Sequence, residues 1–231
     1  MYIEQTNSTN DLIRTLDVDE VWTTYQSSGR GQKGNVWESE RGKNILMSYR
    51  LRGPVPASDA FVITMASSLA VLATINEVLG SPARTSVKWP NDIYVGDKKI
   101  CGILIESRLK GTDIDEAIIG IGLNVNQTRF SFLTPTSLAL ELGKEFVLEP
   151  LHDRLVEHLH TYLRRPSRAI KELYMSHLYR REGYHPYREV STGRVFDARI
   201  AGIGDSGELL LEERTGECHG YLLKQVVFEG R

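Results

Sequence analysis

The chain has 231 residues, of which 41% are hydrophobic, so it can bury a sizeable core in one large domain or in a large and a small one. Its formal net charge of −2 argues against a protein that wraps nucleic acid, because such domains usually carry a basic excess. Two distant cysteines, Cys101 and Cys218, predict neither a disulfide framework nor a zinc site. With no signal peptide and no uninterrupted apolar run near the ~20 residues of a membrane span, the sequence predicts a cytoplasmic protein without a membrane partner.

The first part of the chain predicts strands in hairpins, interrupted by one long helix. β-Branched and aromatic residues predict strands at 21–25 and 44–51, on either side of a glycine-rich loop. From Ser58, a predicted N-cap, apolar residues recur every three or four positions as far as Gly80, a predicted helix stop. Further strands are predicted in this order: 85–89, 93–95, 100–106 and 117–125. Strands in hairpins with separate helices are typical of an α+β domain with a mixed or antiparallel sheet.

The remainder of the chain changes character twice. After Pro150 the helical period returns and is interrupted near Pro166, which predicts a pair of helices. Beyond Gly183, short strands at 194–200, 208–212 and 225–228 alternate with turns and predict a small β-barrel. We therefore expect two domains, residues 1–182 and residues 183–231.

The run Lys88-Trp89-Pro90-Asn91-Asp92 contains charged residues, which are unusual in a sequence that otherwise has the pattern of a buried strand. Pro90 cannot donate to a sheet ladder, so it ends the strand and leaves Asn91 and Asp92 in a turn that faces a cleft or bonds locally. Lys99 then follows at the mouth of a hairpin, from which an ammonium group can reach a carboxylate or phosphate. Taken alone, Lys99 beside Lys98 is better interpreted as an exposed turn lysine.

The loop Gly29-Arg30-Gly31-Gln32-Lys33-Gly34 satisfies the pattern G-x-G-x-x-G. A dinucleotide site is excluded because no helical stripe follows the loop, and a P-loop is excluded because Asn35 stands where Lys and Ser or Thr are needed. A glycine loop that carries Arg30 and Lys33 suits a phosphate or an acyl phosphate. The alternative is a solvated hairpin tip.

These two segments, in this order and spacing, resemble the biotin protein ligase family, whose members attach biotin to a lysine of a carrier domain. The resemblance takes in Ser8-Thr9-Asn10, Gln26, Gly120-Ile121-Gly122-Leu123-Asn124 and Thr136-Ser137-Leu138 as well, and covers most of the chain up to the second helical region. It implies a catalytic domain over residues 1–182 and an SH3-like domain over residues 183–231. It also implies ATP and biotin as substrates, with Mg²⁺ on the triphosphate.

The resemblance assigns roles to individual residues. The implied catalytic residues are Lys99, Arg30 and Asp92, and the sequence leaves open whether Asp92 acts on metal or on the acceptor lysine. Biotin is expected to contact Ser8, Thr9, Asn10, Gln26, Gly29, Arg30, Gly31, Gln32, Lys99 and Gly102. The nucleotide is expected to contact Trp37, Lys88, Asn91 and Asn124. Alternatives remain for several: Ser8, Thr9 and Asn10 also suit a helix N-cap, Asn124 a strand-end turn, and Trp37 a core aromatic.

The implied reaction is the attack of the biotin carboxylate on ATP to give biotinyl-AMP, followed by transfer to a lysine of a biotin carboxyl carrier protein. Such carriers belong to acetyl-CoA carboxylase or a related enzyme, and the sequence does not identify which. Gln32 and Asn35 replace residues that are commonly basic in the family, which leaves the retention of biotinyl-AMP open. Because the chain starts directly in the catalytic region, we expect no DNA binding; a homodimer through an exposed strand edge is compatible with the sequence. Lipoate or octanoate ligation and non-catalytic biotin sensing are the alternatives.

Overall fold

The computed structural model describes residues 1–31, 34, 36–81, 84–131 and 134–230. Its centre is a six-stranded antiparallel sheet with the strand order β1-β2-β6-β5-β4-β3. The strands are β1 (Glu20–Thr23), β2 (Ile45–Pro56), β3 (Thr85–Lys88), β4 (Asp92–Val95), β5 (Lys98–Lys110) and β6 (Asp113–Leu123). The predicted α+β class with an antiparallel sheet is thus confirmed, and β3 ends two residues before Pro90 as expected.

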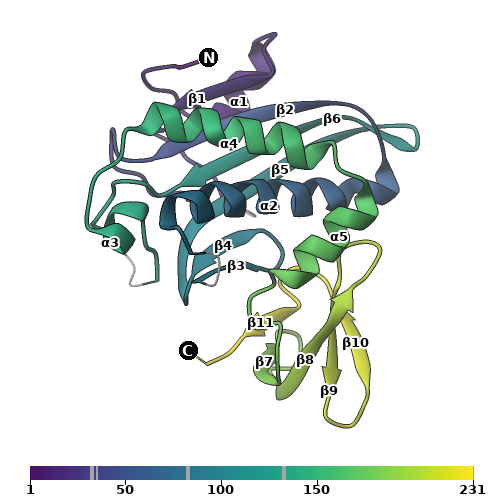
Figure 1. The fold of residues 1–231 in the computed structure, drawn as a ribbon. Helices are drawn as coiled ribbons and strands as arrows, with labels where there is room; N and C mark the ends of the chain where they lie inside the picture. Colours follow the sequence, from purple (N-terminus) through teal and green to yellow (C-terminus); the bar gives the residue numbers. More distant parts are fainter. Residues whose placement is uncertain (32–33, 35, 82–83, 132–133, 231) are drawn as a thin grey trace.

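One face of this sheet is covered by α2 (Ala60–Leu79), α4 (Leu148–Leu163) and α5 (Ser167–Ser176), as Figure 1 shows. The first of these begins two residues after the predicted Ser58, because the short 3₁₀ helix η2 (Ala57–Asp59) precedes it, and it ends at Gly80 with φ 64°. The segment Ala57–Leu79 is long and apolar enough to cross a membrane, but 61% of an apolar 18-residue stretch within it is buried in the protein. It is therefore a core helix of this fold.

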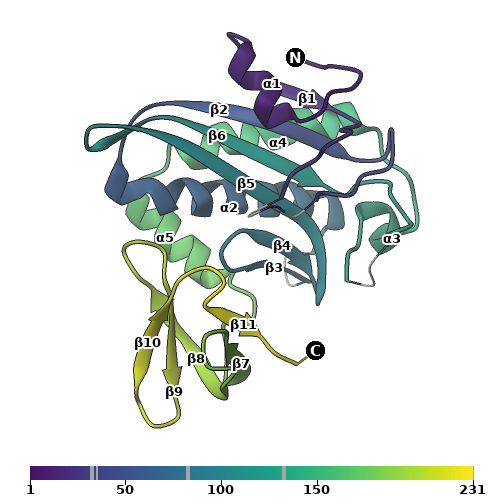
Figure 2. The ribbon, with the colours of Figure 1, turned by 180° about the vertical axis from the view of Figure 1, so that it is seen from behind.

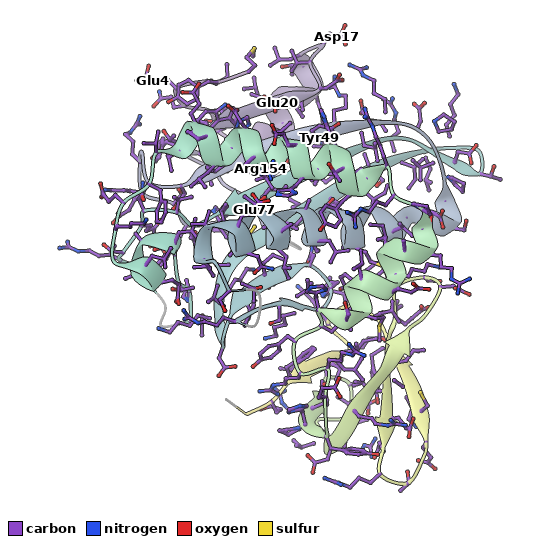
Figure 3. The ribbon with its side chains drawn as sticks, in the orientation of Figure 1. Glu4, Asp17, Glu20, Tyr49, Glu77 and Arg154 are labelled. Carbon is purple, nitrogen blue, oxygen red and sulfur yellow. The ribbon has the colours of Figure 1, made fainter. Side chains whose placement is uncertain are left out.

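An ion pair joins the two long helices on their outer side. Arg154 of α4 donates to both carboxylate oxygens of Glu77 of α2, at 2.6 and 2.7 Å, and the two side chains point toward one another in Figure 3. Between these helices and the sheet lies a continuous apolar core that includes Leu69, Ile119 and Leu159.

The opposite face carries the N-terminal segment and the short helix α1 (Thr9–Thr15). Ser8 precedes this helix as predicted, but its side chain makes no capping hydrogen bond. Figure 2 shows the segment between β1 and β2 passing in front of β6 and β5 on this face. A further short helix, α3 (Leu138–Leu142), which the sequence analysis missed, follows the loop after β6.

The described residues from 185 to 228 contain a second antiparallel sheet with the order β10-β9-β8-β7-β11. Its strands are β7 (His185–Glu189), β8 (Val195–Ile203), β9 (Leu209–Glu213), β10 (Cys218–Tyr221) and β11 (Val226–Phe228). Two of them, β7 and β10, were not predicted, because Pro186 and Gly220 weaken the strand signal. The expected small β-barrel is present as this antiparallel sheet, and no ladder joins β10 to β11 among the described residues, so the barrel is not closed.

Candidate active site

A cavity of about 600 Å³ lies between the large sheet and the segments that cross its α1 face. Its wall comes from the start of α1, the loop between β1 and β2, the strands β5 and β6, and the segment after β6. Most of the predicted site residues line it: Ser8, Thr9, Asn10, Gln26, Arg30, Gly31, Trp37, Asp92, Lys99, Gly102 and Asn124. The fold thus brings together residues that are up to 116 positions apart (from Ser8 to Asn124).

Polar side chains gather at one end of the cavity, where α1 meets β2. The backbone N–H of Thr9 donates to Oε1 of Gln26 at 2.7 Å. Behind them, Oγ of the buried Ser48 lies 2.5 Å from Oδ1 of Asn10 and 2.8 Å from Oγ1 of Thr9. Because an amide oxygen only accepts, the Ser48 hydroxyl donates to Asn10. Sequence analysis missed Ser48, although a serine in the otherwise apolar run Ile45-Leu46-Met47 was an available signal.

A carboxylate on β5 organises the charges beside this polar end. Oε2 of Glu106 accepts from Nδ2 of Asn10 at 2.7 Å and lies 3.1 Å from a guanidinium nitrogen of Arg14. Arg30 lies 4.0 Å from the same oxygen and 2.5 Å from Oδ1 of Asp11. The loop cation is therefore held by two carboxylates, and neither Glu106 nor Arg14 was recognised from the sequence.

Glycines form the floor on which Trp37 rests. Gly102 of β5 and Gly122 of β6 are directly paired across the sheet. A Cβ atom at Gly122 would lie 2.7 Å from Nε1 of Trp37, and one at Gly102 would lie 2.7 Å from Cζ3 of the same ring. Real side chains do not approach so closely, so the absence of side chains at these two positions is what lets the indole lie against the strands.

The predicted catalytic lysine is paired with the predicted catalytic aspartate. Nζ of Lys99 lies 2.7 Å from Oδ1 of Asp92, and each side chain is about one third exposed. The ammonium group is also 5.7 Å from the centre of the Trp37 ring, within the range of a cation–π interaction. The tight turn at Gly96, with φ 57°, returns the chain from β4 to β5 and so sets this pair at one wall of the cavity.

Two buried polar atoms in the cavity wall have no hydrogen-bond partner among the described residues. They are Nε1 of Trp37, a donor, and Oδ1 of Asn124, an acceptor. The amide nitrogen of Asn124 donates to the carbonyl of Thr136 at 3.0 Å, so this side chain is held in one orientation. Because unpaired buried polar atoms are costly, their presence here favours a ligand with both a donor and an acceptor.

Three predicted site residues lie outside the cavity wall. The Gly29 carbonyl accepts from the N–H of Trp37 at 3.0 Å, so Gly29 closes the loop. The Asn91 amide donates to the Ile103 carbonyl at 2.6 Å. Lys88 lies 3.2 Å from the hydroxyl of Tyr94, and burial lowers the pKa of its ammonium group below 10.5. A fourth predicted residue, Gln32, is outside the described residues.

The described residues contain no group of three His, Cys, Asp or Glu side chains that could hold a metal ion. Asp92 and Glu38 are the carboxylates that line the cavity. One or two carboxylates suffice where substrate phosphates supply the other ligands of Mg²⁺. The site therefore fits a metal that arrives with a polyphosphate rather than one held in a protein cage.

Comparisons with known proteins agree on one family. Residues 2–124 match the sequence model of the Biotin/lipoate A/B protein ligase family. The chain is 32% identical over 201 residues to the bifunctional ligase/repressor BirA of Bacillus subtilis, which covers 83% of this chain and 60% of that protein. It is 31% identical over 166 residues to the biotin–[acetyl-CoA-carboxylase] ligase of Mycobacterium tuberculosis, which covers 68% of this chain and 59% of that protein.

Among solved structures, the biotin protein ligase from Aquifex aeolicus in complex with biotin and ATP has a TM-score of 0.77 at 22% identity. The match covers 99% of this chain and 97% of that one. At this identity the likeness shows the fold alone. The chain spans about 60% of the length of the two curated relatives described above.

Proposed function

Because the chain belongs to the Biotin/lipoate A/B protein ligase family, we propose that it is a biotin protein ligase. In the proposed reaction, it activates biotin with ATP to biotinyl-5′-AMP and transfers biotin to a lysine of a biotin carboxyl carrier protein. The observation that carries this proposal is the single cavity that joins the Lys99–Asp92 pair, the Trp37 shelf and the polar end at Thr9 and Gln26. The relative named as a biotin–[acetyl-CoA-carboxylase] ligase supports the same conclusion.

The first step requires positive charge where two anions meet. The biotin carboxylate attacks the α-phosphorus of ATP, pyrophosphate leaves, and no enzyme nucleophile takes part. Lys99 lines the cavity with its side chain partly exposed, and Arg30, on the loop between β1 and β2, lines the same cavity. Charges fixed in this way stabilise the negative charge that develops in the transition state. In the second step the carrier amine attacks the carbonyl carbon of the mixed anhydride, and AMP leaves.

The nucleotide subsite is proposed at Trp37 and Asn124. An adenine ring offers a flat face for stacking, an amino group that donates and ring nitrogens that accept. The unpaired Nε1 of Trp37 and Oδ1 of Asn124 are complementary to such an edge, and Trp37 provides the flat surface. Lys88 and Asn91 lie outside the cavity wall, so we propose that they support the site indirectly or contact the nucleotide only after a rearrangement.

The biotin subsite is proposed at the polar end. The ureido group of biotin has two N–H donors and one carbonyl acceptor, and its thioether ring and tail are apolar. Thr9, Asn10 and Gln26 supply matching polar atoms, and Leu104 of β5 contributes an apolar part of the wall. We propose further that ATP enters as its magnesium complex, with Asp92 either near the metal or near the incoming lysine amine.

Two other functions make different predictions. A lipoate or octanoate ligase shares the adenylation chemistry, but a long acyl chain offers no polar group to the end of the cavity that Thr9, Asn10 and Gln26 line. A biotin sensor without catalysis has no need of Lys99 beside an anion site.

We also propose a cytoplasmic protein with residues 1–182 as the catalytic domain, residues 183–231 as an SH3-like domain, and neither DNA nor a membrane as partner.

The test is biotin-dependent exchange of labelled pyrophosphate into ATP, with octanoate and lipoate run in parallel and Lys99→Ala as the control. Exchange with biotin alone, lost in the variant, is the expected result. Exchange with the other acids would make this a lipoyl-type ligase. Tight biotin binding without any exchange would favour the sensor.

A further inference from the structure

Three consecutive residues before Asp92 are each tied to a different part of the fold. Nε1 of Trp89 donates to the Gly207 carbonyl at 3.0 Å, and the Pro90 carbonyl accepts from the Tyr174 hydroxyl at 2.6 Å. The Asn91 amide donates to the Ile103 carbonyl of β5 at 2.6 Å. Trp89 and Asn91, which donate two of these hydrogen bonds, are buried, so these two bonds are shielded from water.

Tyr174 reaches Pro90 because its helix is anchored on the edge of the large sheet. The N–H of Val87 donates to the His177 carbonyl at 2.8 Å, and the N–H of Tyr179 donates back to the Val87 carbonyl at 2.9 Å. The segment after α5 thus continues the sheet beside β3. The side chain of Tyr174 is completely buried, and burial raises the pKa of its hydroxyl, so it remains a hydrogen-bond donor at neutral pH.

Gly207 reaches Trp89 from the second sheet. It lies in the turn between β8 and β9 with φ 92°, a conformation that favours glycine. A Cβ atom at this position would lie 2.5 Å from Cγ of Phe61 in the first turn of α2. The turn therefore fits against α2 only as glycine, and this fit holds its carbonyl in front of the Trp89 indole.

We propose that Tyr174 and Gly207 are positioning residues for Asp92. The three tethers fix the backbone up to Asn91, and the buried Ile93 fixes it on the other side. Between them, Asp92 is held where its carboxylate meets Lys99 at 2.7 Å. The C-terminal sheet and α5 thereby act on a pair of residues that both belong to the large sheet. This inference rests on the proposed function, since it assigns the tethers a part in adenylation.

The chain offers a matched pair of variants for a test. Tyr174→Phe removes the hydroxyl that bonds Pro90 and keeps the buried ring. Tyr187→Phe removes a hydroxyl from an equally buried ring whose oxygen has no hydrogen-bond partner among the described residues. Both proteins are measured by biotin-dependent pyrophosphate exchange and by hydrogen exchange of the peptide that contains residues 89–93.

The expected result is a loss of kcat of about three- to tenfold for Tyr174→Phe, because a small displacement of catalytic groups is costly. Its KM for biotin should stay within about twofold, and the amides of residues 91–93 should exchange faster. Trp89→Phe, which removes the donor to Gly207, should act in the same direction. Tyr187→Phe should leave kcat and the exchange of this peptide unchanged.

A double-mutant cycle with Asp92→Asn separates positioning from general damage. If Tyr174 acts through Asp92, Tyr174→Phe should reduce kcat no further in the Asp92→Asn background. Equal loss in both backgrounds, an Asp92→Asn variant as active as the wild type, or equal behaviour of Tyr174→Phe and Tyr187→Phe would each overturn the inference. A wild-type protein without exchange would instead overturn the proposed function, and the hydrogen-exchange comparison would still report whether the tether holds the segment.

Discussion

The two faces of the large sheet carry different side chains on the same strands. On β6, Ile119 and Ile121 belong to the helix-covered core, whereas Gly120 and Gly122 alternate with them and face α1 and the cavity. On β5, Cys101 and Ile103 are buried in that core, and Gly102 lies under Trp37. One face is thus filled for stability, and the other lacks side chains at these glycines, so that Trp37 and a ligand can approach the backbone there.

The comparison predicts that changes on the cavity face act on activity and changes on the helix face act on stability. The largest effect on activity is expected for Lys99→Ala. Loss of this charge should reduce pyrophosphate exchange by about a hundredfold or more, because it faces the anions of the first step. Transfer from preformed biotinyl-AMP, measured in single turnovers, should fall much less.

Lys98→Ala is the matched control, since Lys98 is its exposed neighbour on the same strand. It should exchange at the wild-type rate. An equal loss in both half-reactions for Lys99→Ala would show that the lysine serves another purpose.

On the helix face, Ile119→Ala should lower the free energy of unfolding by about 2–4 kcal/mol, because it leaves a cavity in a fully buried position. Exchange per folded molecule should remain within about twofold of the wild type. Urea unfolding and exchange at low temperature measure the two quantities. Leu109→Ala, at a largely exposed position, is the control with little change in either. A large loss of activity in the folded protein would contradict the division between the faces.

The glycine floor gives the opposite pattern. Gly122→Ala should reduce exchange by about tenfold through KM for ATP, because the added methyl group displaces Trp37. Its unfolding free energy should change less than that of Ile119→Ala. Gly202→Ala, whose Cβ would meet Leu210 at an ordinary 3.5 Å, is the control. If Gly122→Ala loses stability and keeps its activity, Trp37 is a core residue rather than a ligand platform.

The role of the loop between β1 and β2 can be tested by measuring how long the enzyme retains biotinyl-AMP. Arg30→Gly should release biotinyl-AMP about five- to tenfold faster, because affinity changes appear mainly in dissociation. Release is followed by rapid gel filtration after a single turnover. Arg41→Gly removes a cation from the same connection, where it stacks on Tyr25, and should retain the intermediate normally. Retention by Arg30→Gly equal to that of the wild type would exclude a lid function for this residue.

The smallest effect is expected on the outer side of the helices, at Glu77→Gln. The hydrogen bond from Arg154 lowers the pKa of Glu77 below 4.5, so its contribution to stability is present above pH 4.5 and is lost as the pH falls through the lower folded-state pKa. Since the pair is largely exposed and screened, Tm at pH 7 should fall by about 2 °C or less. The two proteins should converge in acid, and a difference that grows in acid would contradict this account.

The sequence by itself determined the features that depend on neighbouring residues. The apolar period that ends at Gly80 identified α2, and Pro90 identified the end of β3. Motif order and spacing identified the family and half of the residues that line the cavity. These succeed because helical periodicity, strand alternation and turn chemistry are encoded within a few residues.

Tertiary structure alone decided which distant groups support the site. Ser48 behind Asn10, Glu106 beside Arg14, and Tyr174 on Pro90 join elements that no local pattern connects. The bond from Trp89 to Gly207 spans 118 residues. Likewise, Lys88 turned toward Tyr94 instead of the cavity, and the C-terminal strands stayed an open sheet. Such contacts depend on how whole elements pack, and a residue's type limits which bonds it can make without saying which partner the fold will bring to it.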